Sequence, residues 1–309
     1  MKLQGKIMKK NDWQILFLAV MGVVFLVIFA YVPMFGVLLA FKNGDNQLNI
    51  MNVLINGEWV GFSNFKKVFL DWNFSKILLN TLGLNLLMLV ISFPASIIFA
   101  LFINEIHHPK YRVFVHSVSI FPNFLSWIVF GGIMIALSDM TTGVVNPLLE
   151  VLGLSSPKNP VNLMSAEYFW TMMIISSLIK GTGWGSIVYT AALSRVDKEM
   201  YEAAEIDGAT RMQKMFYISL PSIAPTITVF LLLSISNLLN NNFEQIYTFQ
   251  NAINLTKSEV LATYIYKLGV SQNRYSFTTA LGLMQSLVSI ILLGLGNFIS
   301  KKTAGSGIF

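Results

Sequence analysis

Long runs of apolar residues alternate with short polar segments along the whole chain. Six runs reach roughly the twenty residues with which a helix crosses about 30 Å of hydrocarbon. They cover residues 15–40, 77–103, 113–137, 169–193, 223–239 and 277–299. The pattern predicts an all-α integral membrane protein with six transmembrane helices, in which residues 1–309 form a single transmembrane domain.

The composition agrees with this and limits the chemistry. The chain is 54% hydrophobic and 12% charged, which is far from the range of soluble globular proteins. It has no cysteine, so disulfides, thiolate metal ligands and a cysteine nucleophile are excluded. Because His107, His108 and His116 lack the spacing of a zinc site and no P-loop is present, we expect no metal, no cofactor and no enzymatic activity in this chain.

Lysine and arginine residues are distributed unevenly between the two sides of the predicted bundle. With the N-terminus inside, twelve of them fall in 62 residues, whereas the outer segments hold eight in 103 residues. The positive-inside rule then places both termini in the cytoplasm, as in a multi-pass protein of the cytoplasmic (inner) membrane. The twelve are Lys2, Lys6, Lys9, Lys10, Lys110, Arg112, Arg195, Lys198, Arg211, Lys214, Lys301 and Lys302.

The outer segments are long and rich in Asn, Ser and Gly. We expect them to form short surface helices that meet an external partner, although they could simply link the spans. They cover residues 42–76, 138–168 and 240–276.

Residues 194–222 form a polar, charged island between the fourth and fifth runs. Asp197 is a good N-cap for a short helix over 198–207, and Gly208 after it suits the left-handed conformation that ends a helix. Thr210 and Gln213 have the spacing of a capping box, which predicts a second helix. Methionine and alanine among charged residues are typical of a helix that docks in another protein's groove, while a solvated connector is the alternative.

Three parts of this island form one pattern: Glu202-Ala203-Ala204, then Gly208 after three residues, then Ile218-x-Leu220-Pro221 nine residues later. Through these residues the chain resembles the permease subunits of binding-protein-dependent ABC importers, the MetI-like superfamily, whose cytoplasmic loop carries an "EAA" pattern. The segments 61–65 and 80–81 also resemble this superfamily, and 180–185 resembles its poly- and oligosaccharide importers. The resemblance implies ATPase coupling through Glu202, Ala203, Ala204, Gly208, Ile218, Leu220 and Pro221.

The resemblance implies a MetI-like permease fold and a transmembrane subunit that forms half of a pore for a carbohydrate. The expected partners are a second permease subunit, two ATPase subunits that carry ATP and Mg²⁺, and an external solute-binding lipoprotein. A permease for another small solute, such as an amino acid or a metal, is an alternative. A membrane-bound receptor or scaffold is an alternative of a different class.

Polar residues inside the predicted spans are candidates for the substrate path, because such residues normally face protein or water. Lys180 lies midway along the fourth span, and helical periodicity puts its polar neighbours on the same face. The cation also suggests an acidic sugar. In the alternative, Lys180 is a structural cation bonded to carbonyls or to a partner subunit, and Ser and Asn hold helices together. The candidates are Ser177, Lys180, Gly181, Trp184, Ser234, Asn237 and Asn241.

Overall fold

The computed structural model describes residues 10–304, which fold as helices and turns with no strand in that range. The chain divides into two compact units, one from Met1–Leu70 with Leu268–Met284 and one from Asp71–Lys267 with Gln285–Phe309. A single transmembrane domain over residues 1–309 stays a prediction. Lys2, Lys6 and Lys9, which support the predicted orientation, lie outside the described residues.

The first unit is built on a long N-terminal helix followed by two short ones. Asn64 ties the second short helix to the end of the long one, because its amide donates to the carbonyls of Ala40 at 3.0 Å and Lys42 at 2.9 Å. The long helix consists of α1 (Lys10–Leu26), a π-helical turn (Val27–Tyr31), α2 (Val32–Met34) and a 3₁₀ segment (Phe35–Phe41), and the short ones are α3 (Ile50–Asn56) and α4 (Ser63–Phe69).

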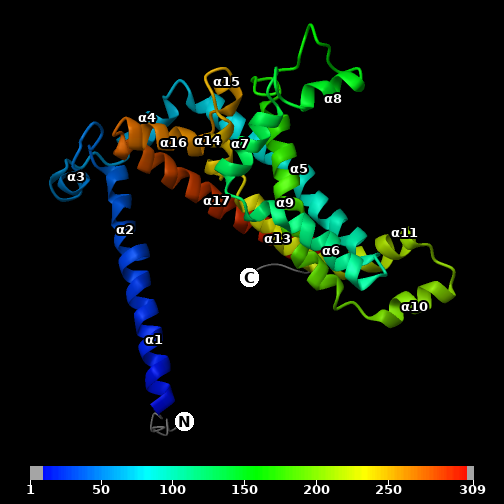
Figure 1. Ribbon diagram of the computed structural model, residues 1–309. Coiled ribbons are helices and arrows are strands. Elements are labelled where there is room, and N and C mark those ends of the chain that lie inside the picture. Colours follow the sequence, from blue (N-terminus) through cyan, green and yellow to red (C-terminus); the bar gives the residue numbers. More distant parts are fainter. Residues whose placement is uncertain (1–9, 305–309) are drawn as a thin grey trace. The chain divides into compact units, whose positions relative to one another are not determined.

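The second unit contains most of the helices (Figure 1). They are α5 (Phe74–Asn104), α6 (Pro109–Ile120), a 3₁₀ turn (Phe121–Phe124), α7 (Trp127–Leu137), α8 (Val145–Val151), α9 (Phe169–Leu193), α10 (Lys198–Ile206), α11 (Arg211–Lys214), a π-helical turn (Met215–Ser219), α12 (Leu220–Ser222), α13 (Ala224–Ser236), α14 (Phe243–Phe249), α15 (Leu255–Ser258) and α16 (Leu261–Tyr266). A π-helical turn (Lys267–Ser271) and α17 (Tyr275–Ala304) continue the chain through both units.

Three helices among the described residues are long and apolar enough to cross a membrane. They are Trp13–Phe41, Phe74–Asn104 and Tyr275–Lys302, and two bent helix pairs raise the number to five if each pair is one span. Helix α9 matches the predicted fourth span in its bounds but is not among these candidates, since its middle carries Lys180 and several small polar residues. The structure thus provides at least three candidate spans, while six spans and cytoplasmic termini stay predictions.

The third predicted span is not a single straight helix, and the chain bends again at the start of the fifth. The run at 113–137 was expected to be one helix, but α6 and α7 are bent by 99° around the turn that contains Pro122. The chain also bends by 65° at Ile223, one residue after α12. Proline lacks the amide hydrogen that continues a helix, and Pro122 and Pro225 each lie next to a bend.

The second unit is organised around α5 and α9, which run side by side (Figure 1). At one end a buried cluster joins them to α14 through Leu84, Met173, Ile246 and Phe249. Glycine allows α6 to approach closely, because a Cβ atom at Gly183 of α9 would overlap the main-chain carbonyl of Ser119. The helices that carry the candidate site residues are therefore packed on a shared α5–α9 core.

Candidate functional site

The polar island at 194–222, called the docking loop from here on, forms the predicted helix, turn and helix. The Asp197 carboxylate accepts from the amide of Glu199 at 3.0 Å, which caps the start of α10. After this helix Gly208 has a φ of +76°, and the amide of Ala209 bonds the carbonyl of Ala204 at 2.8 Å. The left-handed conformation that favours glycine is therefore present where the sequence predicted it.

The second helix begins with the predicted capping box. The amide of Gln213 donates to the Thr210 hydroxyl at 3.3 Å, and the Gln213 side chain accepts from the Thr210 amide at 2.7 Å. The helical segment continues to Ser222 and bends at Ile223, two residues after Pro221. Proline interrupts the hydrogen bonding of a helix, and Pro221 lies next to this bend.

Buried contacts fix the docking loop to the spans. Within the loop, the Tyr201 hydroxyl of α10 lies 2.8 Å from the hydroxyl of Ser219, which is buried. Met215 and Ile223 belong to a core cluster that contains Leu101 of α5 and Leu193 of α9, and Leu220 packs against it. The end of the loop is therefore packed against α5 and α9.

The docking loop exposes apolar side chains among charged ones. Glu202 and Ala203 lie on the exposed side of α10, while Ala204 and Ile218 are half-buried. The large exposed side chains on this surface are Met200, Ile206, Met212, Phe216 and Tyr217. Apolar side chains amid charges are typical of a surface that docks on another protein rather than of an ordinary solvated connector.

One ion pair joins the two helices of the loop. Lys214 Nζ lies 2.5 Å from Glu205 Oε1. The hydrogen bond and charge of Lys214 lower the pKa of the Glu205 carboxyl below its usual value, with a smaller contribution from His107. Because Glu205 is exposed, solvent screens this pair, and it orients the helices more than it stabilises them.

Lys180 reaches into the break between α6 and α7. It is only 5% exposed, and its ammonium group donates to the carbonyls of Pro122 at 3.3 Å, Asn123 at 2.9 Å and Leu125. The Trp127 ring lies 5.1 Å from the same nitrogen, within the range of a cation–π contact. These contacts match the alternative in which Lys180 is a structural cation, and its direct contact with substrate stays a prediction.

The other α9 candidates lie on the same face as Lys180. The Ser177 hydroxyl accepts from Gln245 of α14 at 2.9 Å. The Trp184 ring is half exposed and meets the Phe124 ring edge-on at 6.2 Å, while space is open beside Gly181. This face of α9 is thus directed toward the broken helix pair and α14.

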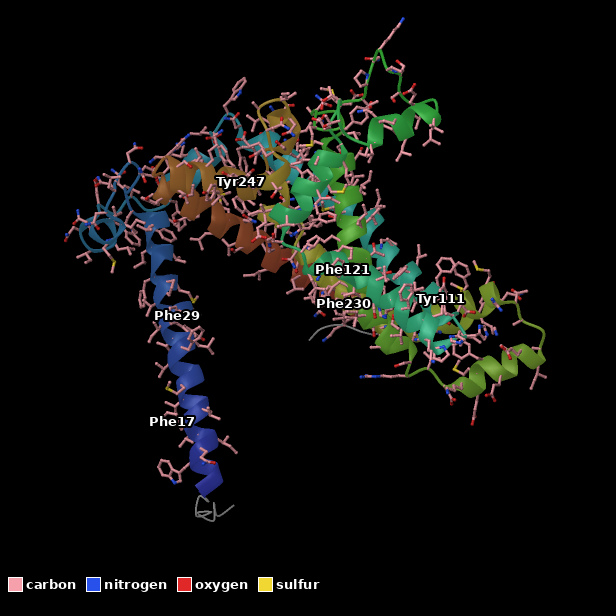
Figure 2. The ribbon with its side chains drawn as sticks, in the orientation of Figure 1. Phe17, Phe29, Tyr111, Phe121, Phe230 and Tyr247 are labelled. Atoms are coloured by element: carbon pink, nitrogen blue, oxygen red, sulfur yellow. The ribbon has the colours of Figure 1, made fainter. Side chains whose placement is uncertain are left out.

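A separate groove lies between α5 and α13 and has a volume of about 310 Å³. It contains two of the predicted path residues, Ser234 and Asn237, together with Phe230, which Figure 2 labels. The remaining lining residues are Asn85, Met88, Leu89, Leu233 and Leu238. Apolar walls with a few amide and hydroxyl groups are the usual composition of a site for a neutral or hydroxyl-rich ligand.

Amide side chains extend from this groove toward α14. Asn241, the third predicted residue of this stripe, donates to Asn85 Oδ1 at 2.8 Å, and Asn85 donates to the carbonyl of Leu238 at the same distance. The buried Oδ1 atom of Asn241 has no hydrogen bond in the described part of the chain. A buried acceptor without a partner is uncommon and marks a place where a donor is needed.

Sequence reasoning missed Asn85 as a site residue. It lies four residues after Thr81 inside an apolar span, and a polar residue there is itself a signal of function. Neither Lys180 nor Trp184 lines the groove, so the predicted path residues fall in two places.

Across residues 10–304 no three His, Asp or Glu side chains meet as a metal site.

The described geometry of helices, broken spans and docking loop agrees with a known family. The model of the family "Binding-protein-dependent transport system inner membrane component" matches residues 92–305. The chain therefore belongs to this family of transport permease subunits and has its MetI-like, all-helical fold.

Relatives of known name match nearly the whole chain. Protein LplB of Bacillus subtilis is 39% identical over 98% of this chain and 92% of its own length. The polygalacturonan/rhamnogalacturonan transport system permease protein YteP of the same organism is 35% identical over 93% of this chain and 88% of its own length. A similar solved structure is the crystal structure of a bacterial alginate ABC transporter in complex with alginate pentasaccharide-bound periplasmic protein. One of its chains matches with a TM-score of 0.84 and 33% sequence identity, over 97% of this chain and 98% of that chain.

Proposed function

We propose that this chain is one transmembrane subunit of an ABC importer for an oligosaccharide and forms half of its pore. The observation that carries the proposal is the docking loop, in which the EAA pattern is complete and which packs through Met215 against α5 and α9. Full-length similarity to the polygalacturonan/rhamnogalacturonan permease and to the alginate transporter supports a carbohydrate as the solute.

The docking loop sits in a groove of an ATPase subunit in this proposal. Met200 and Met212 provide flexible apolar contacts, and Gly208 sets the angle between the two helices. ATP binding closes two ATPase subunits, and the anchored loop tilts the helices around it. ATP and Mg²⁺ bind to those ATPase subunits, and this chain binds no cofactor.

The solute path in the proposal begins in the groove of Asn85, Ser234 and Asn237. Amide and hydroxyl groups can bond the many hydroxyls of a sugar, and the apolar wall contacts its C–H faces. Lys180 holds the break between α6 and α7 in place, which shapes the pore. An external solute-binding lipoprotein delivers the sugar, and a second permease subunit completes the pore.

The solute is an acidic oligosaccharide in this proposal. Alginate is named as an acidic polysaccharide in one of the similar structures, and polygalacturonan is a polymer of a uronic acid. The substrate class can be tested by uptake of labelled trigalacturonate and of a neutral trisaccharide into cells with and without this gene. Loss of trigalacturonate uptake on deletion supports the proposal, and equal uptake in both strains contradicts it.

A further inference from the structure

Three aromatic rings gather on one face of α14 and at the end of α16. Phe243 and Tyr247 are stacked with centroids 5.1 Å apart and an interplanar angle of 20°. Tyr266 closes the group, at 4.9 Å from Phe243 and 5.5 Å from Tyr247. Tyr247 is labelled in Figure 2.

Two of the rings are exposed and Phe243 is half-buried, although the helices that carry them are firmly anchored. Tyr247 is 52% exposed and Tyr266 is 38% exposed. On the opposite face of α14 the Gln245 amide donates to the carbonyl of Met173 and to the hydroxyls of Ser176 and Ser177, all within 3.0 Å. Because the backbone is fixed, a ligand that stacks on these rings orders little new structure.

Charged residues adjoin the rings in the sequence. Glu244 follows Phe243 in the chain, and Lys267 follows Tyr266 and pairs with Glu259 at 3.1 Å. Neither the Tyr247 nor the Tyr266 hydroxyl makes a hydrogen bond within residues 10–304, so both are available to a ligand. Charged side chains next to the rings in sequence, and hydroxyls without a partner, are costly to place in the hydrocarbon of a membrane.

The rings also continue the polar stripe of the groove. Asn237 lines the groove, Asn241 contacts Asn85 of its wall, and Asn242 caps α14 directly before Phe243. The stripe therefore leads from amide groups to an exposed aromatic platform within the same unit. Amides followed by ring faces are the two kinds of group that bind sugar hydroxyls and sugar C–H faces.

We propose that Phe243, Tyr247 and Tyr266 form a stacking site for one sugar ring of the transported oligosaccharide, next to the groove. This inference rests on the proposed function and specifies where the sugar first contacts this chain. The rings would hold the apolar face of the sugar while the phenol hydroxyls bond its hydroxyl groups. Lys267 is close in sequence to the platform and would attract the carboxylate of an acidic sugar.

Substitution in the intact transporter tests the role of the platform. Tyr247→Leu should lower the maximal rate of trigalacturonate uptake about threefold to tenfold, the effect of losing one aromatic contact. Tyr247→Phe keeps the ring and should retain most of the rate. Trp72→Leu, at a 94% exposed aromatic outside the cluster, should leave the rate unchanged. Equal rates in Tyr247→Leu and wild type would overturn the site.

A photocrosslinker identifies what covers the platform. With p-benzoylphenylalanine in place of Tyr247, light should join this chain to labelled trigalacturonate during transport. Exclusive crosslinking to the second permease subunit or to lipid would overturn the proposal. Failure of the proposed function is distinguishable, because then deletion of the whole gene would leave trigalacturonate uptake unchanged, whatever residue occupies position 247.

Discussion

The ammonium group of Lys180 lies 2.9 Å from the main-chain carbonyl of Asn123, inside the break between α6 and α7. Pro122 and Leu125 provide two further carbonyls for the same group. A cation among the free carbonyls at the end of a helix satisfies groups that a bend leaves without partners. Lys180 therefore makes a 99° bend possible within a chain segment of high apolar content.

Lys180→Met should destabilise the transporter, because the carbonyls lose their donor at a cost of roughly 1 to 3 kcal/mol. The unfolding temperature of the purified complex should fall, and Lys180→Arg should restore part of the loss. Uptake of acidic and neutral sugars should decline together. A normal unfolding temperature with selective loss of the acidic sugar would instead show that Lys180 contacts the substrate.

Trp184→Ala provides a comparison on the same helix face. Its ring is half exposed and contacts Phe124 only at an edge, so we expect assembly and basal ATPase activity to be retained. Uptake should fall if Trp184 lies on the substrate path, as its position in the sequence predicts. Normal uptake in this variant would remove Trp184 from the path.

Ser234→Ala and Asn237→Ala should each lower uptake without loss of assembly, since both residues line the groove. Ser236→Ala is a matched control, because its hydroxyl bonds a carbonyl in the same helix and it does not line the groove. The comparison is made by initial uptake rates at equal amounts of transporter in the membrane. If Ser236→Ala is as impaired as Ser234→Ala, the effect belongs to the helix and not to the groove.

Gly208→Val should uncouple transport from ATP hydrolysis. The left-handed backbone at this position would cost valine roughly 1 to 2 kcal/mol and would misplace α10. No atom lies within 4 Å of a Cβ atom placed there, so the effect comes from backbone strain alone. Gly153→Val is matched to it, with a φ of +72° and equally open surroundings in another loop.

The readout for this pair is substrate-stimulated ATPase activity together with uptake. We expect both to fall in Gly208→Val and to persist in Gly153→Val. Equal loss in the two variants would mean that strain in any loop damages the protein.

The Glu205–Lys214 pair predicts a pH dependence of the docking loop. The pKa of the Glu205 carboxyl is lower in the folded loop than in the unfolded chain. The ion pair therefore stabilises the loop fully above the unfolded pKa, about 4.3 for Glu. This stabilisation is lost as the pH falls through the pKa of the folded state. Hydrogen exchange in α10, corrected for intrinsic rates, should therefore increase on acidification in wild type. Glu205→Gln should exchange faster at neutral pH, and an unchanged acid response in that variant would contradict the role of the pair.

Local sequence signals predicted the docking loop well because its structure depends on neighbouring residues. The Asp197 cap, the Gly208 turn and the Thr210 capping box each involve contacts within a few residues. The bend between α6 and α7 could not be predicted in this way. It depends on Lys180, which follows Asn123 by 57 residues in sequence.

The groove was predicted only in part for the same reason. The polar stripe of Ser234, Asn237 and Asn241 follows from helical periodicity, but its opposite wall comes from another helix. Asn85 is joined to Asn241 across 156 residues, and no local pattern indicates that partner. Helix positions are thus encoded locally, whereas the pairing of helix faces depends on packing.

Topology is tested by reporter fusions. A reporter after Lys214 or Lys302 should be cytoplasmic, and one after Asn49, Asn159 or Asn254 should be external, because basic residues are retained inside. Reversal at Lys214 would exclude an ATPase partner for the docking loop.

The most direct test of the account is a crosslink from the docking loop. The chain contains no cysteine, so Ala203→Cys introduces one reactive thiol on the exposed side of α10. With a short bifunctional reagent and membranes that contain the whole transporter, we predict a product that joins this chain to an ATPase subunit and whose yield changes when ATP is added. Labelling of the introduced thiol from the external side of intact cells, with no ATPase product, would contradict the claim that this loop couples transport to ATP hydrolysis.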